Sequence, residues 1–396
     1  MENGKNLATR ALNTDLPIMV KMLELTNSVK DPMPLAKGTV YWQPPEEALE
    51  KVKHITFDPT TSRYGPHEGL PQLNEALTKK LREKNKLLKS SVMVTSGSNQ
   101  GFLNLVLTLC DATDSVVLFA PYFFNAHMSF SMTGITNILI GPSDPITLDP
   151  DTDWLERTLS ETKPTPKLVS LVNPGNPSGK CISEPLLKRF SDICQRAGSW
   201  LVIDNAYEHF MYDGRKHSCI EGNHIINLFS FSKAYGMMGW RVGYIAYPSE
   251  ATALRTQLLK VQDNVAICAP MISQYLALYC LEAGDEWIKN KVKSLGKNKE
   301  LLTEALTPLG KDAVTGEGAI YLWARLPEKY SNDDFEVVCW LARRHSVVVL
   351  PGSACGVSGC IRVTYGGMPL ESCHVAAKRL RKGLEELVTY GMVKEQ

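Results

Sequence analysis

The chain has 396 residues, of which 44% are hydrophobic, so it can bury a large core arranged as two domains or one large one. Its 43 basic and 42 acidic side chains leave a net charge of +1, which gives no electrostatic reason to expect binding to nucleic acid or to an anionic membrane. No apolar run approaches the roughly 18 residues needed to span a bilayer. We therefore expect a soluble protein with neither a nucleic-acid nor a membrane partner.

The first ten residues, MENGKNLATR, lack the apolar core of a signal peptide, so we expect a cytoplasmic protein. Ten cysteines are scattered through apolar runs without the spacing of a disulfide framework, which favours reduced, buried thiols. The eight histidines show no His-x-His or His-Glu-x-x-His spacing, and we expect no metal site.

Residues 1–45 are expected to be an irregular arm that forms part of a small domain, because four prolines between positions 32 and 45 close off any long helix. The segment ends in LAKGTVYWQPP, residues 35–45. Its aromatic residues Tyr41 and Trp42 could line a pocket or simply pack as an arm. A polar loop at residues 62–71, SRYGPHEGLP, then precedes an amphipathic helix.

From residue 92 onward, short β-like runs alternate with stretches long enough for a crossover helix. The strand candidates are residues 92–94, 116–119, 138–140, 168–172, 201–203, 225–229 and 242–247. This alternation predicts an α/β fold whose large domain, residues 46–284, holds a mainly parallel seven-stranded sheet flanked by helices.

The charge density rises beyond residue 285, where a helix is expected over residues 291–306. Strand candidates at 319–325, 347–350 and 360–364 follow, and a last helix is expected over 371–388. Residues 285–396 therefore predict a smaller α+β domain, which we expect to be built from both chain ends.

Polar and small residues follow the first two of these strands, where ligands bind in an open parallel sheet. The stretch TSGSNQG, residues 95–101, opens a helix whose free N–H groups suit a phosphate, although the same residues also make an ordinary helix cap. The stretch APYFFN, residues 120–125, offers aromatic side chains that could stack on a planar ring or merely pack.

Two later strands are also followed by polar groups. In NPGNPSGK, residues 173–180, the side-chain amide of Asn176 can donate to a phenolic oxygen. Asp204 directly ends a strand in DNAYEH, and a carboxylate there is costly unless a positive partner such as a pyridinium nitrogen meets it.

The stretch SFSKAYGMMGWRVG, residues 230–243, contains the most informative lysine of the chain. Desolvation lowers the pKa of a lysine such as Lys233, which is what Schiff-base formation requires. Ser230 and Ser232 precede it, and Arg241 follows eight residues later, so this stretch can also hold a phosphate. The combination describes a pyridoxal phosphate pocket. A surface lysine and arginine in a glycine-containing loop is the alternative from this stretch alone.

Taken together, these motifs resemble those of fold type I, class I/II pyridoxal phosphate-dependent aminotransferases. The resembling set is Asn-Pro-x-x-Pro-x-Gly, Asp-x-Ala-Tyr, Ser-x-Ser-Lys with an arginine eight residues on, and a late Ile-Arg-Val, and it runs from about residue 35 to about residue 387. The resemblance implies pyridoxal 5'-phosphate as cofactor and ping-pong exchange of an amino group between an L-amino acid and a 2-oxo acid. It also implies a homodimer with shared active sites.

The resemblance also implies a role for each site residue. Lys233 is the Schiff-base and proton-transfer lysine, Asp204 faces the pyridine nitrogen, and Asn176 and Tyr207 donate to the phenolic oxygen. The residues expected to bind the phosphate are Ser98, Asn99, Ser230 and Arg241, with Tyr64 from the second subunit, and Gly97 is a further cofactor-binding residue. Phe123, in preference to Tyr122, stacks on the ring. Arg362 holds the substrate carboxylate, Asn176 also binds the substrate, and Gly38 marks the backbone that closes over the substrate.

The chain departs from the family pattern near the substrate. It has GTVYW at residues 38–42 where many relatives have Gly-x-Pro-x-Phe, and it has no Arg or Lys from 261 through 288, where dicarboxylate-specific relatives keep a second arginine. We expect an apolar lining instead, from Tyr41, Trp42, Phe123 and Met237.

Within the family the chain looks most like plant aromatic aminotransferases, which use methionine as donor and indole-3-pyruvate or related aromatic keto acids as acceptor. A carbon–sulfur lyase, such as an aminocyclopropane-carboxylate synthase or a cysteine-conjugate β-lyase, would keep the same cofactor residues. A non-catalytic cofactor-binding protein is a further alternative, but it would be expected to have lost Lys233 or Asp204.

Overall fold

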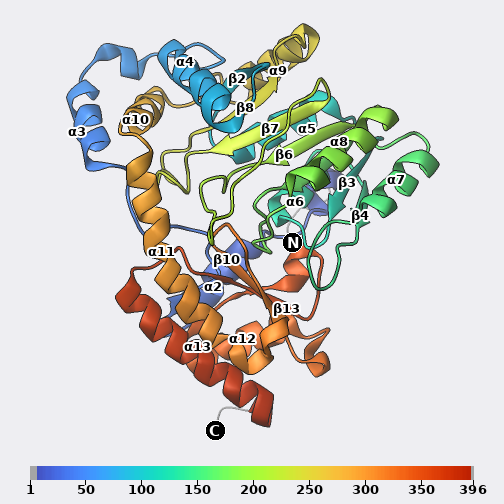
Figure 1. Ribbon diagram of the computed structural model, residues 1–396, viewed down its shortest axis with the longest axis vertical. Coiled ribbons are helices and arrows are strands. Elements are labelled where there is room, and N and C mark those ends of the chain that lie inside the picture. Colours follow the sequence, from blue (N-terminus) through green and yellow to red (C-terminus); the bar gives the residue numbers. More distant parts are fainter. Residues whose placement is uncertain (1–6, 394–396) are drawn as a thin grey trace.

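A seven-stranded sheet organises the upper part of the molecule (Figure 1), in a computed structural model that describes residues 7–393. Its strand order is β2–β8–β7–β6–β5–β3–β4, and only β8 runs antiparallel to its neighbours. The strands are β2 (Ser90–Thr95), β3 (Ser115–Phe119), β4 (Asn137–Gly141), β5 (Leu168–Val172), β6 (Trp200–Asp204), β7 (Ile225–Ser230) and β8 (Gly243–Pro248). The predicted mainly parallel sheet is confirmed.

Helices cover both faces of this sheet because its strands are apolar on both sides. In β3, Val116 and Leu118 pack in one apolar cluster, and Val117 and Phe119 pack in another. The first cluster includes residues of α5 (Ser98–Leu109), α6 (Phe124–Met132) and α9 (Thr252–Val265); the second includes residues of α7 (Thr152–Glu161) and α8 (Glu184–Ala197). Near β2, α10 (Met271–Glu282) packs on α3 (Glu46–Ile55) and α4 (Pro71–Lys80).

The long helix α11 (Asp285–Ala305) leads from the large sheet into the smaller domain, where it packs on α13 (Leu370–Tyr390) (Figure 1). Here α12 (Asp334–His345) and a four-stranded antiparallel sheet complete the fold. The strands are β12 (Leu350–Pro351), β13 (Cys360–Thr364), β10 (Tyr321–Arg325) and β9 (Val314–Thr315), in that order. The strand expected over 347–350 is divided between β11 (Val347–Val348) and β12.

Both ends of the chain contribute to the smaller domain, as predicted. The N-terminal strand β1 (Met33–Pro34) pairs in parallel with β11, so Met33 lies opposite Val347. The domain boundaries at 45/46 and 284/285 stay a prediction.

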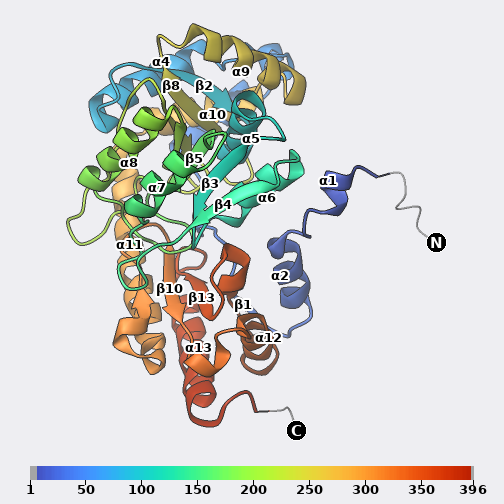
Figure 2. The same ribbon diagram turned by 90° about the vertical axis from the view of Figure 1, so that its right-hand side faces the viewer.

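The expectation that residues 1–45 are irregular is wrong in part. Within this segment, α1 (Thr9–Leu12) and α2 (Ile18–Asn27) are helical. Pro17 stands directly before α2, where a proline does not interrupt helical hydrogen bonds, and no proline falls inside the helix. Met22 is buried, and α2 lies beside α12 (Figure 2). Tertiary packing thus stabilises a helix between the prolines.

Short 3-10 or π-helical turns connect several elements, at Pro59–Ser62, Leu81–Asn85, Thr307–Leu309, Lys311–Ala313, Glu328–Tyr330 and Gly352–Cys355. All ten cysteines are free thiols, and six of them are buried. Among the helices of residues 7–393, none has the length and apolarity to cross a bilayer.

Candidate active site

A cavity of about 310 Å³ lies where the carboxyl ends of β5, β6 and β7 face the smaller domain. This volume is at the lower end of the range of small-molecule sites, about 300–1,000 Å³. Eleven of the residues predicted from the sequence line it: Gly38, Ser98, Asn99, Phe123, Asn176, Asp204, Tyr207, Ser230, Lys233, Arg241 and Arg362. Residues up to 324 positions apart in the sequence, as between Gly38 and Arg362, are therefore brought together as expected.

Lys233 lies in the turn that follows β7, with its amine directed to the backbone of the N-terminal segment. Its Nζ donates to the carbonyl oxygen of Gly38 at 2.5 Å. Burial, followed by the positive charges of Arg362 and Arg241, lowers the pKa of Lys233 to about 8, although Asp204 opposes the shift. A lysine in this setting loses its proton far more readily than a lysine in water.

Asp204 is the last residue of β6, and it lines the same cavity as Lys233. Its Oδ1 accepts a hydrogen bond from the backbone N–H of Ala206 at 2.9 Å. Burial raises the pKa of Asp204 to about 6, although this hydrogen bond and Lys233 favour the ionised form. No basic side chain among residues 7–393 lies within salt-bridge distance of it. The carboxylate is therefore available to a cationic group of a ligand.

Arg362, in the middle of β13, is 1% exposed and yet lines the cavity. Its Nη1 donates to Oδ1 of Asn176 at 2.7 Å, and its Nη2 donates to the carbonyl oxygen of Ala36 at 2.6 Å. Its Nε is buried without a hydrogen-bond partner, and within the described part of the chain no carboxylate pairs with it. An uncompensated buried guanidinium is a strong site for an anion.

The phosphate-binding candidates gather at the N-terminus of α5. Ser98 is the first residue of that helix, and its free N–H groups and dipole favour an anion there. Gly97, with φ +84°, precedes it; a Cβ at this position would overlap the guanidinium of Arg241. Ser230, at the end of β7, also lines the cavity. Gly97 is thus placed to let Arg241 approach the helix N-terminus.

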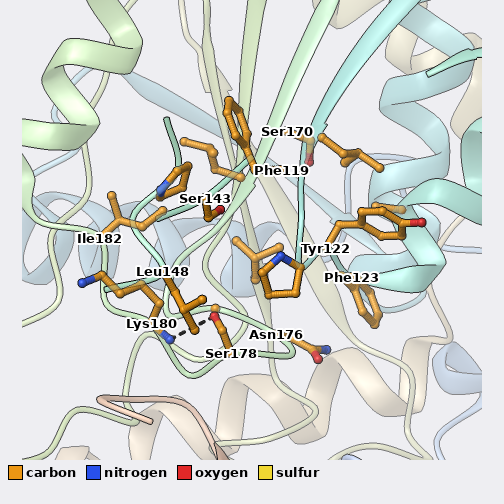
Figure 3. A pocket seen from close by; sticks show the side chains of 17 residues that line it. Phe119, Tyr122, Phe123, Ser143, Leu148, Ser170, Asn176, Ser178, Lys180 and Ile182 are labelled. Atoms are coloured by element: carbon orange, nitrogen blue, oxygen red, sulfur yellow. Dashed lines mark hydrogen bonds between the residues drawn. The ribbon is translucent and has the colours of Figure 1, made fainter. Parts of the chain in front are cut away.

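Of the two aromatic residues considered for stacking on the cofactor ring, Phe123 lies at the cavity and Tyr122 does not. Phe123 lines the cavity, whereas Tyr122 stacks on His127 with ring centres 5.3 Å apart. Tyr122 belongs to a neighbouring smaller pocket, which shares Phe123, Val172 and Asn176 with the cavity. Figure 3 shows Phe123 and Asn176 at one end of that pocket and Lys180 and Ile182 at the other.

Among the predicted phosphate ligands, Tyr64 is the one that the single chain does not bring to the cavity. Its side chain is 80% exposed, and it lies in the loop after the 3-10 turn Pro59–Ser62. A contact between Tyr64 and a phosphate in this cavity therefore requires a second subunit.

Three residues expected to line the substrate side do not do so. Trp42 is buried, donates from Nε1 to the carbonyl oxygen of Ala234 at 3.2 Å, and stacks on Phe210. Met237 is also buried, with its sulfur 3.8 Å from the sulfur of Cys280. Tyr41 points to Ser294, 3.2 Å away. Trp42 and Met237 are thus covered by the core, and Tyr41 is 38% exposed outside the cavity.

The sequence did not single out several residues that do line the cavity, namely Met19, Lys37, Phe124 and Tyr321. Lys37 stands next to Gly38, and this adjacency is the one local signal that could have found it. Tyr321 stands in an apolar strand, and Met19 in a helix that was not expected, so neither carries a local sign of function.

These residues fit pyridoxal 5'-phosphate. The donor set of Ser98, Ser230 and Arg241 suits its phosphate, and the otherwise unpaired carboxylate of Asp204 suits its ring nitrogen. The lowered pKa of Lys233 favours the uncharged amine, which is the form that reacts with the aldehyde of the cofactor. Among residues 7–393, no group of three or more His, Cys, Asp or Glu is arranged to hold a metal ion.

Comparisons with known proteins agree with this site. The family model described as aminotransferase class I and II matches residues 30–380. Aromatic aminotransferase ISS1 from Arabidopsis thaliana is 61% identical over 388 residues, with 98% of each chain covered. The bifunctional aspartate aminotransferase and glutamate/aspartate-prephenate aminotransferase of Petunia hybrida is 30% identical, with 82% of this chain and 70% of that protein covered. The solved aromatic aminotransferase from Pyrococcus horikoshii OT3 has a TM-score of 0.82 at 25% identity, covering 92% of this chain and 99% of that one.

Proposed function

Since the chain belongs to the class I and II aminotransferases, which use pyridoxal 5'-phosphate, we propose that it exchanges an amino group between an aromatic or methionine-like L-amino acid and an aromatic 2-oxo acid such as indole-3-pyruvate. The observation that carries the choice of substrate is the surroundings of Arg362. Its guanidinium carbon lies 4.4 Å from the ring centre of Tyr321 and 5.9 Å from that of Phe124. An amino acid whose carboxylate is held there would have its own side chain among aromatic groups. The Arabidopsis relative is named an aromatic aminotransferase.

In the proposed mechanism, the cofactor supplies a carbonyl carbon for the amino group and a ring that takes up electrons. Lys233 Nζ would take the proton from the substrate's Cα and later give it up again, which its lowered pKa permits near neutral pH. Asp204 would accept a hydrogen bond from the protonated ring nitrogen. Arg362 orients the substrate carboxylate with its planar fork and takes no part in bond breaking.

A second candidate is a dicarboxylate substrate, because Lys37 lines the cavity and no acidic side chain among residues 7–393 forms a salt bridge with it. The Petunia relative is named for aspartate, glutamate and prephenate. An exposed ammonium at the mouth would pair with the distal carboxylate of glutamate or 2-oxoglutarate. It would do so more weakly than a buried arginine fork.

A panel of amino donors tests the substrate class. With indole-3-pyruvate as acceptor, we expect kcat/KM for phenylalanine, tyrosine, tryptophan and methionine to exceed that for aspartate and glutamate by about tenfold or more, since an unpaired distal carboxylate in an aromatic lining costs over 1.4 kcal/mol. Replacing the ammonium in Lys37→Met should leave the aromatic values within about twofold. Higher kcat/KM for glutamate, lost in Lys37→Met, would establish the second candidate instead.

We also propose that the protein is a cytoplasmic homodimer. The exposure of Tyr64 at 80% and of the nearby Phe57 at 92% supports a partner surface over this segment, and two-fold symmetry would make the contact reciprocal. The ten free cysteines support a reducing compartment. Sedimentation at several concentrations tests the dimer, and imaging of a tagged protein tests the location.

A further inference from the structure

Tyr321 is a buried side chain that joins three parts of the active site. It is the first residue of β10 and is 1% exposed, yet it lines the cavity. Its hydroxyl oxygen lies 2.5 Å from that of Tyr207. Neither hydroxyl has another hydrogen-bond partner among residues 7–393. The two groups therefore satisfy each other in a site where an unpaired hydroxyl would be costly.

The ring of Tyr321 supports the guanidinium of Arg362. The distance from the guanidinium carbon to the ring centre is 4.4 Å, within the range of a cation–π contact. This contact is significant because Arg362 has no carboxylate partner within the described part of the chain and keeps an unpaired Nε. The aromatic face therefore supplies stabilisation that does not compete with an incoming anion.

The third part is the segment that meets Lys233. A Cβ at Gly38 would overlap the hydroxyl of Tyr321, so that hydroxyl fixes how closely the segment approaches. The carbonyl oxygen of Gly38 accepts from Lys233 Nζ at 2.5 Å. Tyr321 thus touches the Tyr207 hydroxyl, the Arg362 guanidinium and the backbone that binds the lysine.

We propose that Tyr321 is a positioning residue for amino transfer, whose hydroxyl orients and polarises Tyr207 while its ring holds the plane of Arg362. When the Tyr321 hydroxyl donates to Tyr207, the proton of Tyr207 is left free to point into the cavity. A donor that itself accepts a hydrogen bond donates more strongly. The inference rests on the proposed roles of Tyr207 and Arg362 at this site.

Tyr321→Phe removes the hydroxyl and keeps the ring. The readout is the pH midpoint of the visible absorption band of the holoenzyme, which reports protonation at the Lys233 nitrogen. Weaker donation from Tyr207 to the cofactor's phenolic oxygen leaves the proton on that nitrogen to higher pH, so we expect an upward shift of about half a pH unit. KM for the amino acid should stay within about twofold, because the ring still supports Arg362.

Tyr321→Leu removes the ring as well. It should show the same shift and also raise KM for every carboxylate substrate by about fivefold or more, since the cation–π contact is lost. Tyr365→Phe is the matched control: Tyr365 is equally buried in the same domain, donates to the carbonyl oxygen of Ala319 at 2.8 Å, and does not line the cavity. It should leave both the midpoint and KM unchanged.

Double substitution separates this inference from the role of Tyr207. Tyr207→Phe alone should raise the midpoint, and adding Tyr321→Phe should shift it no further, because the second hydroxyl acts through the first. Additive shifts, an unchanged midpoint in Tyr321→Phe, or an equal shift in Tyr365→Phe would overturn the inference and leave the role of Tyr207 standing. An unchanged midpoint in Tyr207→Phe would overturn both.

Discussion

At the scale of single residues, the cavity contains an amine, that of Lys233, and a carboxylate, that of Asp204, and burial disfavours the charged form of both. Burial lowers the pKa of Lys233 to about 8 and raises that of Asp204 to about 6. Burial also raises the pKa of Tyr207 well above its usual value, so its hydroxyl keeps its proton and can act as a donor. The site therefore holds a base that becomes available just above neutral pH beside a carboxylate that stays mostly ionised.

The lowered pKa predicts the pH dependence of Lys233 reactivity in the apoenzyme. Only the uncharged amine reacts with acetic anhydride, so its labelling should rise as the pH increases through about 8, more than two units below the ordinary lysine value of 10.5. Lys297, whose pKa is raised by its exposed partner Glu300, is the internal control and should reach half-labelling only above pH 10.5. Mass spectrometry of peptides labelled with limiting reagent measures both. Parallel profiles for the two lysines would contradict the account.

Most of the chemical groups of the site could be predicted because each directly follows a strand that the apolar pattern reveals. Asp204 and Lys233 are examples, since their types and positions are informative without tertiary structure. Tyr321 and Lys37 could not be found this way. Their importance comes from side chains that converge from β10 and from the N-terminal segment, and no local pattern encodes that convergence.

At the scale of elements, the start of α5 and the turn between β7 and β8 form one unit. The turn supplies Lys233 and Arg241, and Arg241 lies against Gly97 just before the helix. Trp42 supports the same turn from behind by its hydrogen bond to Ala234. A helix N-terminus and a guanidinium are thereby held side by side, and both groups favour the binding of a phosphate.

Gly97→Ala tests this unit. The added methyl would displace the Arg241 guanidinium, and loss of a charge-assisted hydrogen bond, roughly 1.5–3 kcal/mol, should weaken cofactor binding by about tenfold or more. Gly284→Ala is the matched control because Gly284 is also a helix N-cap with a similar backbone, φ +84° and ψ 179° against φ +84° and ψ 160° for Gly97, but a Cβ there would meet nothing within 4 Å. Both variants should lose about 1–3 kcal/mol of stability from backbone strain, since each glycine has a backbone conformation that other residues rarely adopt. Equal cofactor affinity in the two variants, measured by fluorescence titration of the apoenzymes, would contradict the role of Gly97.

At the scale of the whole molecule, the cavity lies between two domains that the chain crosses more than once. The N-terminal segment supplies Gly38, the large sheet supplies Lys233 and Asp204, and β13 supplies Arg362. The alternation of apolar runs and helical stretches was sufficient to predict the mainly parallel sheet and its helical layers. Helix α2 was missed because its apolar residues become informative only when the smaller domain packs against them.

The proposed dimer predicts complementation between two inactive variants. Tyr64→Asp should repel the phosphate of the neighbouring subunit's cofactor, and Lys233→Ala lacks the reactive amine, so each should be nearly inactive alone. In a mixed dimer, one site combines an intact Lys233 with an intact Tyr64. Co-expression should restore at most about half of the activity per hybrid dimer, because only one of its two sites is whole. Mixed dimers that form but remain inactive would place Tyr64 outside the partner's site.

Amino transfer at Lys233 is tested most directly by a single half-reaction. Purified holoenzyme is mixed with excess L-methionine or L-phenylalanine and no acceptor, and the keto acid and ammonia released are quantified. An aminotransferase should release one keto acid per active site and then stop, with no ammonia, and indole-3-pyruvate should restart turnover by accepting the retained amino group. Lys233→Ala should release almost none over the same time. Continued release of keto acid with ammonia in the absence of acceptor, or full release by Lys233→Ala, would contradict the account.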